Sequence, residues 1–227
     1  MPKLLEMCPQ DLRAAREKNL PLFIPVGTVE YHGSQLPLGT DLYISKGIVD
    51  EISKKVDIVV APPFVYSPGG YAVSGPEKGT VDISVDCFSQ HCYEILKAYR
   101  QMGFERIYVI VHHQPENIMI MLKNVFLKLS MYEVSEEIGN GWWTDGKSTP
   151  HRCSFITEKA TLDTGCFGGH GGKGETEAIM ALYPQLVRKD LLSENEPFWN
   201  ETVIDANEEN AKRELDIVIN KWIEKLK

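Results

Sequence analysis

Short apolar segments alternate with segments of helical spacing through the first 130 residues, and this alternation constrains the fold most. Continuous apolar runs of strand length predict buried strands at 22–26, 57–61 and 107–111. Apolar residues at helical spacing, or on most faces of a segment, predict helices at 44–56, 87–102 and 117–129. Strands that alternate with helices predict a mostly parallel sheet covered on both faces, which is a three-layer α/β/α sandwich.

The second half of the chain gives weaker signals, but nothing in it divides the chain. A strand is predicted around 153–157, a helix at 175–183 that is stopped by Pro184, and an amphipathic helix at 207–227. No internal repeat, low-complexity tract or linker is present. We therefore expect residues 1–227 to form a single domain.

Composition excludes several classes of protein. The formal net charge of -8, without a basic patch, argues against nucleic-acid binding. No apolar run approaches the roughly 20 residues that span a bilayer, and the N-terminus lacks the apolar core of a signal peptide. The five cysteines show no Cys-x-x-Cys spacing, so they are expected to be free thiols in a reducing compartment. We expect a cytoplasmic protein with a small-molecule substrate, and no nucleic-acid or membrane partner.

A glycine-framed loop at 27–41 follows the first predicted strand and carries three potential metal ligands, Glu30, His32 and Asp41. In open α/β sheets ligands gather at the carboxyl ends of strands, where this loop lies. Glu30 and His32 are two residues apart, so in extended backbone both side chains face the same side. Asp41 precedes a helical segment, and it can either cap that helix or point into a site.

The third predicted strand ends in His112 and His113, and Glu116 follows at the start of the next helix. Parallel strands end at the same edge of a sheet, so these side chains are expected beside the first loop. Carboxylates and imidazoles without a thiolate suit Zn²⁺, Mn²⁺ or Fe²⁺, and an excess of carboxylates suits two ions that share one carboxylate. Singly, Asp41 has an ordinary explanation as a helix cap and Glu30 as a solvated loop residue. Together, the set Glu30, His32, Asp41, His113 and Glu116 indicates a metal site.

A second glycine-rich loop, 165–174, contains His170 and is followed by Glu175 and Glu177 in the first turn of a predicted helix. Glycines permit positive φ and close backbone approach to a ligand. A phosphate cradle is one interpretation, but the loop lacks the Gly-Lys-Ser/Thr ending of a P-loop and no strand immediately precedes it. A further carboxylate–histidine element of the same site fits better. The helix dipole alone also favours carboxylates at these positions.

With these three elements together, the sequence resembles the creatininase (creatinine amidohydrolase) family. The first loop is similar, almost position by position, to the family's Gly-x-x-Glu-x-His-Gly-x-x-Leu-Pro-Leu-x-Thr-Asp signature. The strand that ends in His113 is similar to the family's strand ending in Asn-Gly-His. The segment 170–176 resembles its His-Gly/Ala-Gly-x-x-Glu-Thr element. The resemblance spans about residues 20–190 in the same order, and the first motif is the most specific.

The resemblance implies a hydrolase with a binuclear centre of two divalent ions (Zn, Mn or Fe), commonly a homohexamer. By position, it implies metal ligands at Glu30, His32, Asp41, His113 and Glu175. Asp41 would bridge the two ions. Glu116 and His170 would be the catalytic residues that move protons, and either Glu116 or Glu175 would complete the ligand set.

The sequence departs from the family pattern in three places. His112 stands where the family has glycine, and Gln114-Pro115 adds one residue before Glu116. The family's tryptophan shortly before the third-motif histidine is absent, and Trp142 and Trp143 are candidates for another aromatic wall. The family also includes hydrolases of formamides and of cyclic diketones from inositol breakdown.

We therefore expect hydrolysis of a small cyclic amide or a related C–N bond, by water activated between two ions bridged by Asp41. The alternatives are a cyclic-diketone hydrolase of inositol or sugar catabolism, similar to 3-dehydro-scyllo-inosose hydrolase, or a formamide deformylase. A non-catalytic metal-binding relative is a further alternative, as is an enzyme whose glycine-rich loop and Lys173 hold a phosphorylated substrate.

Overall fold

A sheet of parallel strands in the order β2-β1-β3-β4 forms the centre of the protein. The computed structural model describes residues 3–69, 71, 73–113, 115–129, 154–157, 167, 169–192 and 203–226. The strands of the sheet are β1 (Leu22–Val26), β2 (Val59–Val60), β3 (Ile107–Val111) and β4 (Ser154–Thr157). β1 and β3 pair in full register, from Leu22 with Ile107 to Val26 with Val111. Because both strands end at the same level, the loops that follow them emerge side by side.

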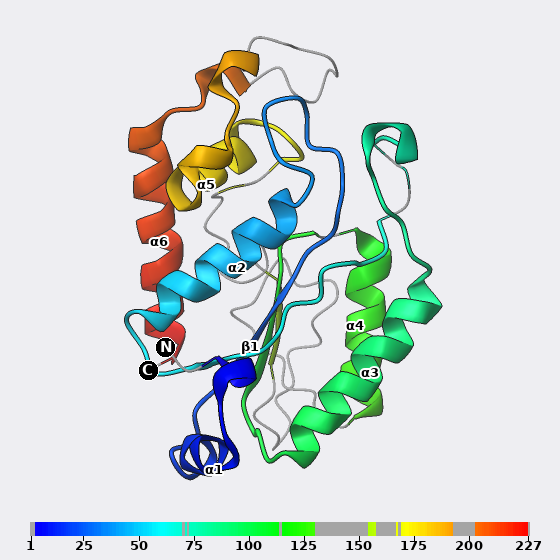
Figure 1. Ribbon diagram of the computed structural model, residues 1–227, viewed down its shortest axis with the longest axis vertical. Helices are drawn as coiled ribbons and strands as arrows, with labels where there is room; N and C mark the ends of the chain where they lie inside the picture. Colours follow the sequence, from blue (N-terminus) through cyan, green and yellow to red (C-terminus); the bar gives the residue numbers. More distant parts are fainter. Residues whose placement is uncertain are drawn as a thin grey trace.

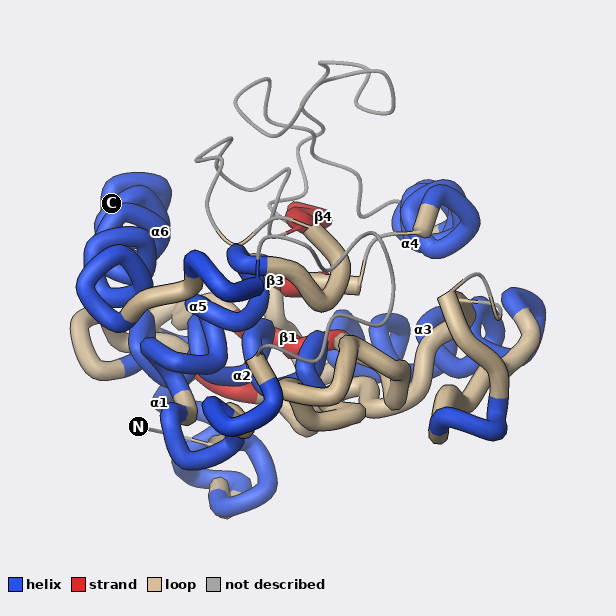
Figure 2. Tube along the Cα trace, turned by 90° about the horizontal axis from the view of Figure 1, so that it is seen from above, coloured by secondary structure: helices blue, strands red, loops and turns tan. Residues whose placement is uncertain are grey.

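Helices cover both faces of this sheet, as Figures 1 and 2 show. One face carries α3 (Val85–Gln101) and α4 (Glu116–Lys128), and the other carries α2 (Thr40–Ser53), α5 (Lys173–Leu182) and α6 (Glu208–Leu226). Side chains of β1 alternate between the two cores: Ile24 packs on the α3–α4 side and Phe23 on the α2–α5–α6 side. The predicted three-layer α/β/α sandwich with a parallel sheet is confirmed.

The predicted helices are present, with starts that differ by up to four residues. Before β1 the chain forms a 3₁₀ turn, η1 (Leu4–Glu6), and α1 (Pro9–Glu17). Further 3₁₀ turns are η2 (Pro76–Lys78), η3 (Pro184–Leu186) and η4 (Lys189–Leu191). The hydroxyl of Ser84 accepts a hydrogen bond from Cys87 N–H and caps α3. Gly103 follows that helix with a φ of 95°, the left-handed conformation expected at this position.

Glu177 attaches the C-terminal helix to α5. Its carboxylate is buried and accepts hydrogen bonds from the backbone N–H of Asn207, at 3.1 Å, and from the side chain of Asn210, at 2.5 Å. A buried carboxylate needs such donors because burial otherwise penalises its charge. Glu177 is therefore a structural residue, two positions away from Glu175, which faces the candidate site.

Among the described residues, no helix is both long enough and apolar enough to cross a bilayer. Trp142 and Trp143, the candidates for an aromatic wall, lie outside the described residues.

Candidate metal centre

A contact between two backbone segments places Asp41. Gly27 follows β1, and a Cβ atom added to it would lie 2.3 Å from the backbone nitrogen of Leu42. Only glycine allows the end of β1 to approach the first turn of α2 this closely. Asp41, in that first turn, is thereby held at the carboxyl edge of the sheet with a side chain that is 2% exposed.

Asp41 is not the N-cap of α2, which was one of its two expected roles. Gly39 occupies the N-cap position, and Asp41 is the second residue of the helix. Its Oδ1 lies 3.3 Å from Nε2 of His32, and its Oδ2 lies 3.2 Å from Nδ1 of His113. The carboxylate therefore points into the site and faces a different histidine with each oxygen.

Hydrogen bonds fix the loop that carries Glu30 and His32. The N–H of Glu30 donates to Leu38 O at 2.8 Å and closes the loop on itself. The N–H of Tyr31 donates to Oγ1 of Thr80, at 3.2 Å. The Glu30 Oε2 and His32 Nε2 atoms lie 4.0 Å apart, so the two side chains share one side of the chain, as their spacing predicts.

His113 follows β3 and faces two carboxylates. Its Nδ1 lies 3.2 Å from Oε2 of Glu30 and 3.2 Å from Oδ2 of Asp41. On the other side of the ring, a Cβ atom added to Gly69 would lie 2.5 Å from Nε2 of His113. Gly69 thus leaves just enough room for the imidazole, whose position is set between a backbone segment and the two carboxylates.

Glu175 reaches the site from the first turn of α5. The N–H of Gly171 donates to its Oε2 at 2.6 Å, and its Oε1 lies 3.0 Å from Nε2 of His112. Gln35 ties this segment to the first loop, because its side-chain amide donates to Gly171 O at 2.8 Å and to Thr176 Oγ1 at 3.2 Å. The Gly171 N–H that a phosphate cradle would need is therefore used by the protein's own carboxylate.

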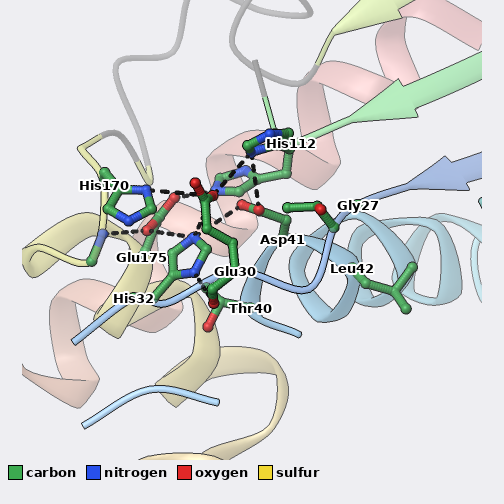
Figure 3. Close-up of polar contacts among 12 residues, drawn as sticks. Gly27, Glu30, His32, Thr40, Asp41, Leu42, His112, His170 and Glu175 are labelled. Atoms are coloured by element: carbon green, nitrogen blue, oxygen red, sulfur yellow. Dashed lines mark hydrogen bonds and ion pairs between the residues drawn. The ribbon is translucent and has the colours of Figure 1, made fainter. Parts of the chain in front are cut away.

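The side chains form three overlapping groups, and the candidate ligand atoms within each group lie within 4.8 Å of one another. We call Glu30, Asp41 and His113 the first ligand group, and His32, Asp41 and Glu175 the second ligand group. The third combines Glu30, His32 and His170. Figure 3 shows Glu30 and His32 from the loop after β1, Asp41 from the first turn of α2, and His170 and Glu175 from the segment around the start of α5, with their side chains pointing toward one another. Asp41 belongs to both of the first two groups.

The buried nitrogen and oxygen atoms of the cluster are arranged to coordinate divalent cations, and several of them have no hydrogen-bond partner among the described residues. His32 donates from Nδ1 to Glu30 O at 2.9 Å, which leaves the Nε2 lone pair facing the carboxylates. Four buried atoms of the first two groups have no hydrogen-bond partner among the described residues: Glu30 Oε2, His32 Nε2, Asp41 Oδ2 and His113 Nε2. Buried polar atoms without partners are costly. Bound cations would satisfy the two carboxylate oxygens and Nε2 of His32.

The charges of the cluster shift the pKa values of its histidines upward. Burial lowers the pKa of His32, but the carboxylates of Asp41 and Glu175 outweigh it and raise the pKa to about 10. Burial likewise lowers the pKa of His113, and the carboxylates of Asp41 and Glu30 raise it to about 9. The metal-free cluster therefore needs positive charge, which either protons or metal ions can supply.

The carboxyl groups shift in the opposite direction. Burial raises the pKa of Asp41, but His32 and His113 more than offset it and hold the pKa well below its usual range. For Glu175, burial raises the pKa, while the charge of His32 and the hydrogen bond to His112 lower it. Both carboxyl groups therefore stay ionised at neutral pH, as metal ligands must be.

His170 differs from His32 and His113 in its exposure and in the carbonyl to which it donates. Its side chain is 26% exposed, whereas those of His32 and His113 are at most 9% exposed. Its Nε2 lies 2.8 Å from Tyr31 O, and because a carbonyl only accepts, Nε2 carries the proton. Its other ring nitrogen, Nδ1, lies 3.8 Å from Oε2 of Glu30.

Most of the predicted site residues lie together at the carboxyl edge of the sheet. The cluster contains Glu30, His32, Asp41, His113, His170 and Glu175. Glu116 begins α4 directly after this edge, but its side chain lies outside the described residues, so its catalytic role stays a prediction.

Sequence reasoning left two contributors out of the site. His112 was placed at the same edge but not in the site, and the doublet His112-His113 at a strand end was the signal available. Gln35 gave no signal, because Gly171 and Thr176, the partners that tie it to the α5 segment, lie more than 130 positions away.

Comparison with known proteins agrees with the motif pattern. The creatininase family model, described as creatinine amidohydrolase, matches residues 5–221. A 3-dehydro-scyllo-inosose hydrolase of Thermotoga maritima is 23% identical over 185 residues, covering 78% of this chain and 54% of the relative. This chain therefore spans about half the length of that relative. A creatinine amidohydrolase of Pseudomonas putida is 22% identical over 191 residues, covering 78% of this chain and 69% of the relative.

A solved structure of a mutant creatininase of the Zn-Zn type shares the fold. The TM-score is 0.73 at 15% identity, with 99% of this chain and 96% of that chain covered. The family match extends over nearly the whole sequence and includes the strands, loops and helices that build the cluster. This chain belongs to the creatininase family.

Proposed function

We propose that this protein is a metal-dependent hydrolase that holds two divalent ions and opens a C–N bond in a small cyclic amide or a related molecule. The observation that carries the proposal is the pair of ligand groups that share Asp41, with buried donor atoms that lack other partners. A single ion would leave one of these groups unused. The name of the Zn-Zn creatininase structure supports a pair of ions in this fold.

The first ion would be held by Glu30, Asp41 and His113, and the second by His32, Asp41 and Glu175. The separate directions of the two Asp41 oxygens support a bridging role for this residue. Ligands of this kind, carboxylate and imidazole without thiolate, suit Zn²⁺, Mn²⁺ or Fe²⁺. When bound, two such ions lower the pKa of a shared water molecule and polarise a carbonyl oxygen.

The charge of the ligand set favours a substrate that develops negative charge. The carboxylates of Glu30, Asp41 and Glu175 carry three negative charges, and two divalent cations carry four positive ones, which leaves an excess of about one positive charge. In a buried site this excess is poorly screened. It would stabilise the oxygen of a carbonyl group as that carbonyl is attacked.

His170 is suited to accept a proton and to return it. Its Nε2–H is donated to Tyr31 O, and its Nδ1 faces the carboxylate of Glu30, so Nδ1 is the atom we assign to proton exchange with the site. Its partial exposure also makes it the most accessible histidine of the cluster to a substrate. We assign it the role of general acid–base residue, and Glu116 at the start of α4 remains a second candidate for this role.

A cyclic diketone is the second candidate class of substrate. The Thermotoga relative that is named 3-dehydro-scyllo-inosose hydrolase is as similar to this chain as the Pseudomonas creatinine amidohydrolase. Attack on a ring carbonyl is common to both reactions, so the same metal centre serves either. The difference lies in whether the departing atom is nitrogen or carbon.

Metal analysis paired with a substrate screen tests the proposal. The purified protein is expected to contain about two divalent ions per chain. It should hydrolyse at least one member of a panel of lactams that includes creatinine, of formamides or of cyclic 1,3-diketones, and a chelator should abolish the activity. A protein that binds no divalent ion, or one that keeps its activity after demetallation, would contradict the proposal. The homohexamer implied by the family resemblance stays a prediction, which sedimentation analysis can test.

A further inference from the structure

His112 stands at the junction between the sheet and α5. It follows β3 immediately, and its side chain is 4% exposed. The family pattern has glycine at this position, so the imidazole is a feature of this chain's own sequence. Its Nε2 lies 3.0 Å from Oε1 of Glu175, a residue 63 positions further along the chain.

The direction of this hydrogen bond follows from chemistry. An ionised carboxylate only accepts hydrogen bonds, so Nε2 of His112 is protonated and its N–H donates a hydrogen bond to Oε1. The other oxygen, Oε2, accepts the N–H of Gly171 at 2.6 Å and lies 3.6 Å from Nε2 of His32. The two oxygens of Glu175 are therefore distinct: Oε1 faces His112, and Oε2 faces the second ligand group.

We propose that His112 is a positioning residue, which holds Glu175 so that Oε2 alone binds the second metal ion. This inference rests on the proposed two-ion function and deepens it. Without a donor at Oε1, the carboxylate can rotate about its terminal torsion, which is broad. Outer partners of metal ligands commonly fix orientation in this way, and their loss typically costs about 10- to 100-fold in metal affinity.

Two substitutions separate positioning from direct ligation. His112→Gln places an amide N–H near the position of Nε2 and keeps a donor to Oε1. His112→Leu fills similar space without any donor. His91→Leu is a matched control, because His91 is an exposed histidine on α3. Calorimetric titration of the demetallated proteins with Zn²⁺ and with Mn²⁺ measures the two binding steps. The electron paramagnetic resonance of bound Mn²⁺ reports whether a coupled pair forms.

The expected result is a selective loss at one ion. His112→Leu should weaken the second binding step by about 10- to 100-fold and abolish the signal of the coupled Mn²⁺ pair, with the first step unchanged. His112→Gln should restore both to near the wild-type values, and His91→Leu should match the wild type. Thermal unfolding of the metal-free proteins shows whether His112→Leu still folds. If it does not, the test is the comparison of the two binding steps between His112→Gln and the wild type.

Other outcomes would overturn the inference. If every variant bound both ions as tightly as the wild type, His112 would have no part in metal binding, while the two-ion function would stand. Equal loss in His112→Gln and His112→Leu would make His112 a ligand in its own right. A wild-type protein that binds no divalent ion would overturn both this inference and the proposed function.

Discussion

The two ligand groups are built in different ways. The first group combines Glu30 and His113, from the loops that directly follow the paired strands β1 and β3, with Asp41 from the first turn of α2, and Gly69 packs against its histidine. The second group depends on Glu175, which arrives on α5 from far along the sequence. Hydrogen bonds from Gln35 to Gly171 O and Thr176 Oγ1, and from His112 to Glu175, connect the start of α5 to the first loop and to the end of β3.

The positions of the side chains in the two groups are therefore determined in two different ways. The geometry of the first group follows from the register of the sheet and from the close approach of Gly27 to α2, and a substitution on the surface cannot shift either one. The geometry of the second follows from the docking of a helix through a few buried hydrogen bonds, each worth about 1 kcal/mol net. The second group is therefore the easier one to loosen, and substitutions that affect one group or the other can test this.

The largest effect is expected for Asp41→Ala, because this residue belongs to both groups. The variant should lose both ions and its hydrolytic activity while it keeps the fold, since the sheet and its helices do not depend on this carboxylate. Elemental analysis and circular dichroism measure the two properties. Full activity in a variant without bound metal would show that the groups do not act through Asp41.

Gly69→Ala is expected to damage the first group alone. The added methyl would lie 2.5 Å from Nε2 of His113 and force the ring out of the position in which its Nδ1 faces Glu30 and Asp41. We expect the first ion to bind about 10- to 100-fold more weakly, as when the support of a ligand is lost.

Gly75→Ala is the matched control in the same loop. There the new methyl meets only the carboxylate of Glu77, an exposed and flexible side chain. Calorimetric titration should show two normal binding steps for this control. Equal loss in both variants would mean that the whole loop, and not the contact with His113, determines affinity.

Gln35→Ala should loosen the second group with a smaller effect. The variant loses the hydrogen bonds to Gly171 O and Thr176 Oγ1, so the free energy of unfolding is expected to fall by about 1–2 kcal/mol. The second ion should bind roughly tenfold more weakly. Gln90→Ala on the surface of α3 serves as the control, and denaturant unfolding with metal titration checks both. A weakened first step would contradict the division into two groups.

The smallest effect concerns pH. The pKa values of about 10 for His32 and about 9 for His113 lie above the usual value near 6.5. Protonation of these residues therefore stabilises the metal-free fold below about pH 6.5, and this contribution is lost as pH rises through 9 and 10. Metal ions compete with the same protons, so the rise in Tm on adding Zn²⁺ should be larger near pH 9 than near pH 6.5. Calorimetric scans test this, and an equal or smaller rise at high pH would contradict it.

The sheet and most helices could be predicted from the sequence because their signals are local. Strands such as 22–26 and 107–111 are short apolar runs, and parallel strands bring their ends together wherever the rest of the chain lies. This is why Glu30, His32 and His113 could be placed at one edge. The predicted strand at 57–61 forms only Val59–Val60, because it pairs with the first part of β1 alone.

The position of α5 could not be predicted in the same way. The pair formed by His112 and Glu175 depends on how a helix docks, and no local pattern of residues encodes that docking. The two possible roles of Asp41 also could not be separated from the sequence, because they depend on where α2 begins and on how its first turn packs against the end of β1. The family resemblance named the candidate ligands, but it could not supply a partner at a position where the family pattern has glycine.

The seam between Gly27 and Leu42 has a consequence for protein engineering. The position of Asp41 is set by direct packing of the Gly27 backbone against the backbone of Leu42. No side chain lies between the two segments that a substitution could exchange. A library that aims at a different ion preference gains nothing from variation at this seam, where most members would lose the centre altogether. Variation at Gln35 and His112, which contact the α5 segment, would instead change the affinity for the second ion and leave the first ion as an internal reference.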